Sequence, residues 1–147
     1  MTVKDVRQPA SRIEVEDFRG AVAQYRRHPD GGGLVEVSAQ VHDSVTVHES
    51  AYVEAGAVVG ACSSLGARSW VEADVVIGAA ATIAKNVHIG AGSRIGAGAH
   101  LGTGARVGAF AVVAPGARVS TDVVVPDRSV VLAQGRRAPR SDFGTAA

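Results

Sequence analysis

Every sixth residue from Val41 to Val131 is aliphatic, and this period constrains the fold more than any other feature of the chain. The series is Val41, Val47, Val53, Val59, Leu65, Val71, Ile77, Ile83, Ile89, Ile95, Leu101, Val107, Val113, Val119, Val125 and Val131. The residue directly after the aliphatic one is often glycine, and the residue four positions after it is always small or β-branched. An unbroken internal period of this kind indicates a solenoid, in which each repeat buries its apolar face on its neighbours.

Six residues accommodate a short strand and a tight corner, and three such units close one triangular coil. A helix or an alternating surface strand would need a partner face elsewhere. Equivalent residues then stack eighteen positions apart, at a strand spacing of roughly 4.8 Å. Three residues after the aliphatic position, types that tolerate a left-handed backbone occur at Gly56, Asp74, Asn86, Gly92, Gly98, Gly104, Gly116 and Asp122. Arg68, Phe110 and Arg128 depart from that preference.

Ile89-Gly90-Ala91-Gly92-Ser93 and Ile95-Gly96-Ala97-Gly98-Ala99 resemble the repeats of the hexapeptide-repeat transferase family. The resemblance covers Val41 to about Gln134 and implies an all-β fold, a left-handed parallel β-helix of about five triangular coils. Parallel crossovers are right-handed by default, so the left hand is implied by the resemblance alone.

The residues before the repeat predict a short α-helix. Ser11 and Glu14 form a capping box, and Val15, Phe18, Val22 and Tyr25 follow helical spacing. We therefore expect a helix and glycine-rich joint over residues 1–34, the β-helix over 35–134, and a mobile basic tail over 135–147. The helix is expected to cap the first coil; a partner-binding helix is the alternative.

Composition limits the classes of partner. The formal net charge is +1, which gives no global attraction to nucleic acid or to an anionic membrane. No apolar run is long enough to span a bilayer, and no signal-peptide pattern is seen. The single cysteine, Cys62, cannot form an internal disulfide and fits a reducing cytoplasm. We expect a single domain in the cytoplasm.

The outward residues before each aliphatic position fall into three columns. The first contains Tyr52, Trp70, His88, Arg106 and Val124, the second Thr46, Ser64, Thr82, His100 and Arg118, and the third Val58, Val76, Arg94, Val112 and Val130. The third column is a valine stripe that is costly to expose to water. Family members usually form trimers, so we expect a homotrimer that buries this stripe.

The resemblance also implies acyl transfer from acetyl-coenzyme A, as co-substrate, to an amine or hydroxyl of a small-molecule acceptor. In the family, a histidine acts as general base in a cleft between subunits, and coenzyme A lies toward the C-terminal coils. His88 is the first candidate for that catalytic role and His100 the second. Trp70 and Arg106 flank His88 in the first column and are candidates for substrate binding through ring stacking and anion recognition.

The basic residues of the C-terminal tail are candidates for cofactor binding. The terminus from Val113 resembles the usual acyltransferase ending, and its Arg136 and Arg137 are positioned in sequence to meet coenzyme A phosphates. A solvated basic tail is the alternative.

Two departures from the family leave other functions open. The branch that acetylates amino-sugar nucleotides has a His-Asp pair where this chain has Ala79 and Ala80, so an orienting carboxylate for His88 would have to come from another chain, through Glu72 or Asp74. No loop interrupts the repeat between Val41 and Val131, whereas such rods normally form their substrate pockets from loops, so a non-catalytic structural or assembly trimer is the alternative. A γ-class carbonic anhydrase-like metal protein is more remote, because the histidine spacings do not match its ligand pattern, and no metal is expected.

Overall fold

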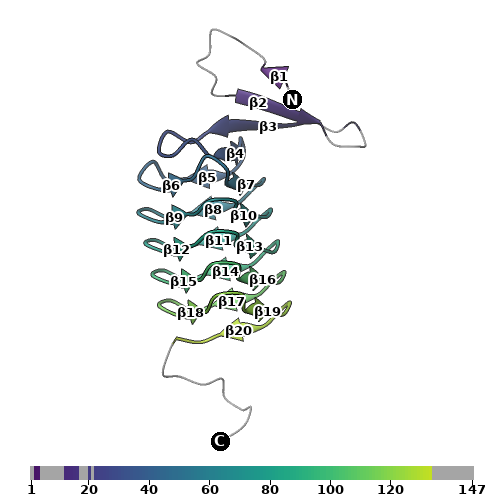
Figure 1. Cartoon of the computed structure of the whole chain (residues 1–147). Helices are drawn as coiled ribbons and strands as arrows, with labels where there is room; N and C mark the ends of the chain where they lie inside the picture. The colour runs from purple at the N-terminus through teal and green to yellow at the C-terminus, as the bar shows by residue number, and fades with distance from the viewer. Residues whose placement is uncertain (1, 4–11, 17–19, 21, 134–147) are drawn as a thin grey trace, which may run out of the picture.

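The computed structural model is a column of stacked coils built from very short parallel strands (Figure 1). It describes residues 2–3, 12–16, 20 and 22–133. Three sheets run along the column, one on each side of the coils. The part of the chain that the structure describes contains strands and turns but no helix, and therefore none with the length and apolarity to span a bilayer.

Sheet 1 has nine strands and includes the N-terminal residues. In chain order these are β1 (Thr2–Val3), β2 (Arg12–Glu16), β3 (Val22–Arg27), β4 (Leu34–Glu36), β7 (Tyr52–Val53), β10 (Trp70–Val71), β13 (His88–Ile89), β16 (Arg106–Val107) and β19 (Val124–Val125). From β4 onward, neighbouring strands in this sheet are parallel and eighteen residues apart.

The other two sheets contain only solenoid strands. Sheet 2 is formed by β5 (Gln40–Val41), β8 (Val58–Val59), β11 (Val76–Ile77), β14 (Arg94–Ile95), β17 (Val112–Val113) and β20 (Val130–Val131). Sheet 3 is formed by β6 (Thr46–Val47), β9 (Ser64–Leu65), β12 (Thr82–Ile83), β15 (His100–Leu101) and β18 (Arg118–Val119). Five complete three-strand coils, from β4–β6 to β16–β18, are followed by β19 and β20. The parallel β-solenoid of about five coils is confirmed; its left hand stays a prediction.

The strand register places the outward residues in the three predicted columns. On sheet 1, Trp70 pairs with Tyr52 on one side and with His88 on the other. On sheet 3, Thr82 pairs with Ser64 and with His100. The inward aliphatic residues form the core, from Val35 to Val125, and those of the middle coils are at most 3% exposed. The period in the sequence is thus the period of the core.

Every corner from Gly56 to Arg128 has the left-handed backbone conformation, including the three at which the sequence departs from the favoured residue types. The φ angles are 58° at Arg68, 56° at Phe110 and 62° at Arg128. The Phe110 N–H donates to the Ala91 carbonyl at 2.9 Å in the preceding coil. The other corner N–H groups also find an acceptor in the preceding coil, which is a carbonyl or, as at Arg68, a serine hydroxyl. The Arg128 guanidinium lies over the Phe110 ring, 5.3 Å from its centroid. Pairing between coils therefore holds even bulky residues in this conformation.

The predicted N-terminal helix is wrong. Over its described residues the chain forms β2 and β3, which pair in antiparallel fashion, and β3 pairs in turn with β4 (Figure 1). The stretch Arg12–Glu16 alternates polar and apolar residues with the period of a strand. The edge of β4 supplies a template of unpaired backbone groups, and satisfying them outweighs a helical spacing carried by only a few residues.

Strand β3 leads into a turn that closes the first coil with a buried histidine. His28 is 2% exposed, and its Nε2 donates to the Val45 carbonyl at 2.7 Å. The Gly33 N–H donates to the Val47 carbonyl at 2.9 Å. The N-terminal residues thus cover the edge of β4, although with strands in place of the expected helix.

Candidate functional site

The outer surface of sheet 1 brings together three of the predicted site residues. Trp70, His88 and Arg106 begin the consecutive strands β10, β13 and β16 and lie in register. The Trp70 indole and the His88 imidazole are stacked, with ring centroids 4.5 Å apart and planes 3° apart. The parallel register places these side chains one strand spacing apart, which is the distance at which flat rings stack.

His88 has a carboxylate partner within its own chain. Its Nε2 is hydrogen-bonded to a carboxylate oxygen of Glu72, and each side chain is 30% exposed. This corrects the expectation that an orienting carboxylate must come from another subunit. Because a carboxylate only accepts, the neutral imidazole carries its proton on Nε2 and leaves the Nδ1 lone pair as a proton acceptor.

A second carboxylate repeats this arrangement one coil earlier. The Trp70 Nε1–H donates to Glu54 Oε2 at 3.0 Å, with the same separation of sixteen residues that joins Glu72 to His88. The other oxygen, Glu54 Oε1, accepts from the Tyr25 hydroxyl at 2.5 Å. Burial, and then the neighbouring Glu54 carboxylate, raise the pKa of Tyr25 well above its usual range.

In the two coils that follow Glu72, the position occupied by Glu54 and Glu72 is occupied by glycine. Gly90 and Gly108 follow Glu54 and Glu72 in this column, and here the surface has a hollow of about 340 Å³. Its lining includes Glu72, His88 and Arg106. Among the residues described, none forms an ion pair or hydrogen bond with the Arg106 guanidinium. The hollow therefore combines a base, its carboxylate and a cation open to an anionic group.

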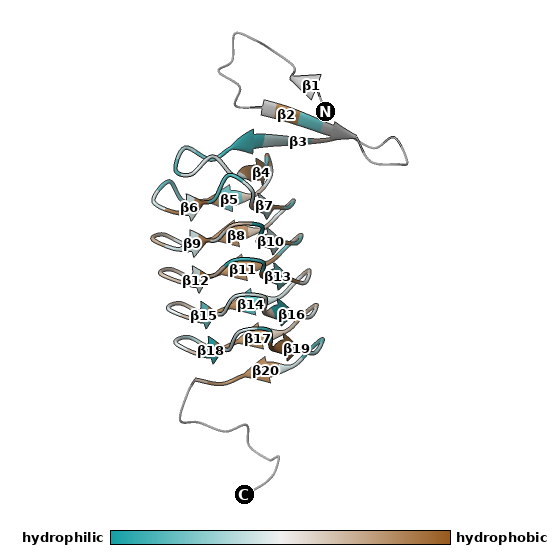
Figure 2. Ribbon diagram, viewed as in Figure 1, coloured by the Kyte–Doolittle hydropathy of each residue, from teal (hydrophilic) through white to brown (hydrophobic). Residues whose placement is uncertain are grey.

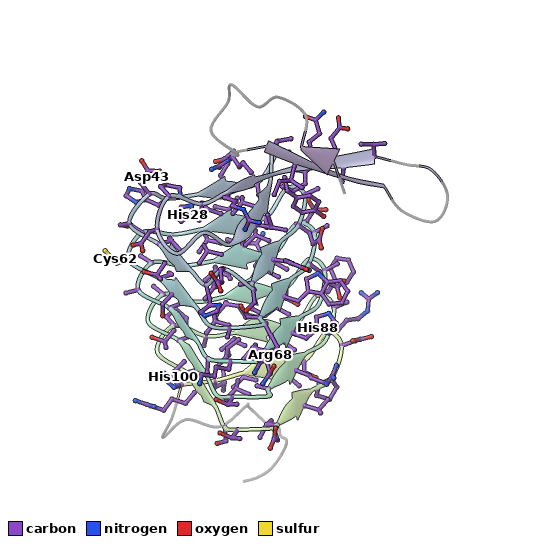
Figure 3. All side chains as sticks on the ribbon, turned by 45° about the horizontal axis from the view of Figure 1, so that its top comes forward. His28, Asp43, Cys62, Arg68, His88 and His100 are labelled. Carbon is purple, nitrogen blue, oxygen red and sulfur yellow. The ribbon has the colours of Figure 1, made fainter. Side chains whose placement is uncertain are left out.

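The remaining predicted site residues do not join this cluster. His100 begins β15 on sheet 3, where it pairs with Thr82 and Arg118, and Figure 3 shows it on the opposite side of the column from His88. Arg136 and Arg137 lie outside the described residues. Of the two histidine candidates, only His88 has a carboxylate hydrogen bond within the described part of the chain.

The described residues contain no group of three His, Cys, Asp or Glu side chains that could hold a metal ion. His42 and His48 instead contact their own corners. Their Nδ1 atoms accept the N–H groups of Ser44 at 3.0 Å and Ser50 at 3.1 Å. The metal-protein hypothesis finds no support in this part of the chain.

Sequence reasoning missed Glu54 and Tyr25 and assigned Glu72 to the wrong chain. The signal for the two carboxylates is their spacing: each follows an aliphatic core residue, sixteen positions before an outward ring. Two successive coils repeat that offset. No comparable signal points to Tyr25, because its contact depends on how the N-terminal strands join sheet 1.

Comparisons with known proteins agree with the repeat and the fold. Residues 63–103 match the model of the bacterial transferase hexapeptide (six repeats). A search of curated proteins gave no match. Among solved structures, the acetyltransferase domain of PglB from Neisseria gonorrhoeae is similar both with acetyl coenzyme A (24% identity, TM-score 0.53) and without it (24%, 0.55).

These structural likenesses cover 73% and 76% of this chain. They cover 56% and 58% of the PglB domain chains, so this chain spans little more than half their length. A mutant of GDP-perosamine N-acetyltransferase from Caulobacter crescentus, with CoA and GDP-perosamine, aligns at 27% identity and a TM-score of 0.40, covering 70% of this chain and 54% of that chain. Residues 63–103 thus match bacterial-transferase hexapeptide repeats, and the chain has a β-solenoid fold similar to that of the PglB acetyltransferase domain.

Proposed function

We propose that this protein is an acyltransferase that moves an acetyl group from acetyl-coenzyme A to an amine or hydroxyl of a small molecule. The observation that carries the proposal is the His88–Glu72 pair at a hollow that also exposes Arg106. A base with a fixed tautomer and a nearby unpaired cation are the groups that such a transfer needs from the protein.

In this proposal His88 Nδ1 accepts the proton of the acceptor's amine or hydroxyl as it attacks the thioester carbon of acetyl-coenzyme A. Glu72 holds the Nε2 proton and stabilises the imidazolium that forms, since the carboxylate is already its hydrogen-bond partner. The C–S bond of the thioester then breaks, and the imidazolium returns its proton to the departing thiolate, so that coenzyme A leaves as the free thiol. Arg106 binds an anionic group of donor or acceptor, and Arg136 and Arg137 contact coenzyme A phosphates.

The donor is proposed on two grounds. The PglB domain to which the fold is similar is described in complex with acetyl coenzyme A. The hollow of about 340 Å³ has room for the reacting ends of the substrates and not for a whole coenzyme A molecule. The rest of the donor then lies along the surface of the column or against a second subunit.

The proposal includes a homotrimer in the cytoplasm. Exposed valines on sheet 2 support the trimer: Val76 is 36%, Val112 37% and Val130 56% exposed. Exposing a row of valine side chains to water is unfavourable, and contact with another copy of the chain would remove that cost. The single cysteine, Cys62, fits a reducing compartment.

Ligand binding is tested first, by thermal shift. Acetyl-coenzyme A at about one hundred times its Kd is expected to stabilise the fold by about 2.7 kcal/mol, with free acetate at the same concentration as the control. Thiol release is then followed with a panel of amines and alcohols. If acetyl-coenzyme A gives no shift at millimolar concentration, the enzyme proposal is wrong and the non-catalytic trimer takes its place.

A further inference from the structure

A continuous set of contacts runs from the N-terminal strands to the imidazole of His88. Tyr25 lies on β3, and its hydroxyl donates to Glu54 Oε1 at 2.5 Å. Glu54 Oε2 accepts the Trp70 Nε1–H at 3.0 Å, and the indole is stacked on the imidazole. The first residue of this series is 63 positions away from the last in sequence (88 − 25), so only the tertiary structure joins them.

These contacts restrain His88 in a way that Glu72 alone does not. The Glu72 carboxylate holds one atom of the ring, Nε2, and leaves rotation about that contact open. The stacked indole, with planes 3° apart, fixes the orientation of the ring. Trp70 has one polar atom, so its own orientation depends on the hydrogen bond from Nε1 to Glu54.

Glu54 is in turn held at both ends. Each of its two oxygens accepts one hydrogen bond, from Tyr25 and from Trp70, and this selects one orientation of the carboxylate. The raised pKa of Tyr25 keeps its phenol protonated, so the hydroxyl remains a donor over the working range of an enzyme. Removing the phenol oxygen frees one end of Glu54 without adding volume.

We propose that Tyr25 and Glu54 are positioning residues that act through Trp70 to hold the His88 imidazole in its reactive orientation. This inference rests on the proposed function of the His88 site. It gives the N-terminal strands a role in the chemistry, because Tyr25 on β3 helps to hold His88, which lies three coils further along the column.

The first test uses Trp70, the only tryptophan in the chain, as a reporter. A protonated imidazole stacked on an indole quenches its emission, so the wild-type fluorescence should titrate with His88. The charged groups around that ring are Glu72, Arg106 and Asp127, which all line the same hollow. His88→Gln should abolish the transition. Tyr25→Phe should reduce its amplitude at least twofold, because the two rings no longer stay stacked.

The matched control is Tyr52→Phe. Tyr52 pairs in register with Trp70 on sheet 1, yet its hydroxyl has no hydrogen bond with any described residue. Its loss should leave the amplitude of the Trp70 titration unchanged. A second variant, Glu54→Gln, keeps the shape of the side chain but cannot accept both donors. Adding Tyr25→Phe to it should give no further decrease, since both act through one carboxylate.

Kinetics provide the second readout. Tyr25→Phe should lower kcat about five- to tenfold with the KM for acetyl-coenzyme A within about twofold, as expected for one hydrogen bond that orients a base. A change in KM alone would contradict a positioning role. Melting temperatures of the variants, followed by circular dichroism, separate this effect from loss of fold.

The outcomes for the two proposals are distinct. If the enzyme assay fails but Tyr25→Phe weakens the Trp70 titration and Tyr52→Phe does not, the positioning contacts are supported and acyl transfer is not. If acyl transfer is found while Tyr25→Phe and Glu54→Gln match the wild type in both titration and kcat, the positioning role is overturned and the function stands.

Discussion

At the residue scale, the chemistry of this surface depends on which nitrogen of His88 is free. The bond from Nε2 to Glu72 leaves Nδ1 as the base, and Arg106 begins the next strand. Removing the carboxylate leaves both tautomers available and removes the counter-charge for the imidazolium.

We expect His88→Ala to lower turnover by at least about 100-fold, the lower range of a general base. Glu72→Gln should lower it by about 10- to 100-fold, since a hydrogen bond to a charged group is lost. Asp74→Asn is the control, because this neighbouring carboxylate lies at a left-handed corner that asparagine also tolerates. Thiol release from acetyl-coenzyme A measures all three. Wild-type turnover in His88→Ala would remove this residue from the mechanism.

Tyr25 predicts an alkaline effect on stability. Its pKa is raised in the folded protein by burial and by Glu54. Above the usual tyrosine pKa of about 10, the unfolded chain loses the phenol proton while the folded one keeps it, so stability falls as pH rises. Melting followed at pH 9 and pH 11 should show a larger decrease for wild type than for Tyr25→Phe. Equal decreases would mean that Tyr25 does not contribute.

At the element scale, the corners show how the coil tolerates varied sequences. Residues with φ between 56° and 76° recur every six positions from Gly56 to Arg128. The N–H of each is hydrogen-bonded to the preceding coil, so residue type alters the strain but not the path of the chain.

Two corners in one column allow the effect of residue type on the free energy of unfolding to be measured in both directions. Gly98 has φ of 70° and open space where a Cβ would lie, so Gly98→Ala should cost about 1 kcal/mol through backbone strain alone. Ala80, in the same column at φ of 58°, should stabilise when replaced by glycine, by up to about 1 kcal/mol. Denaturant unfolding measures both. The same sign for the two variants would show that side-chain contacts, not φ, decide the effect.

The N-terminal strands protect the first coil. Strand β3 covers the edge of β4, and His28 closes the end of the core with its bond to Val45. Deletion of residues 1–30 should expose that edge and the buried Val35, and promote end-to-end association. Size-exclusion chromatography and melting temperature test this. A truncated protein that elutes and melts like the full chain would exclude a capping role.

At the scale of the whole molecule, the three faces of the column differ in composition. Figure 2 shows β17 and β20, on sheet 2, as hydrophobic, while β14 between β11 and β17 is hydrophilic because of Arg94. Val76 and Val112 lie on either side of Arg94 in this column.

If sheet 2 forms the trimer interface, Val76→Asp with Val112→Asp should dissociate it, since each buried carboxylate would lack a partner. Thr46→Asp and Thr82→Asp on sheet 3 are the matched controls, with charge added to a polar face. Light scattering at micromolar concentration gives the mass. A monomer for the unmutated protein would remove the trimer from the proposal.

The sequence by itself determined the solenoid, the number of coils and the three outward columns. It did so because a core residue recurs every six positions. When the core residues have a fixed spacing, the coils can stack in only one register. Trp70, His88 and Arg106 were therefore placed together from sequence. The corners were also predicted, except at positions such as Phe110, where pairing between coils overrides residue preference.

Only the tertiary structure decided the N-terminal fold and the partners of the site. The residues before the repeat have no period to enforce one structure, and the free edge of β4 selects strands over a helix. The contacts of Tyr25 with Glu54, and of Glu72 with His88, join residues through side-chain orientations across coils. A repeat fixes where each Cα lies in the column, whereas hydrogen bonds between side chains depend on directions that periodicity does not encode.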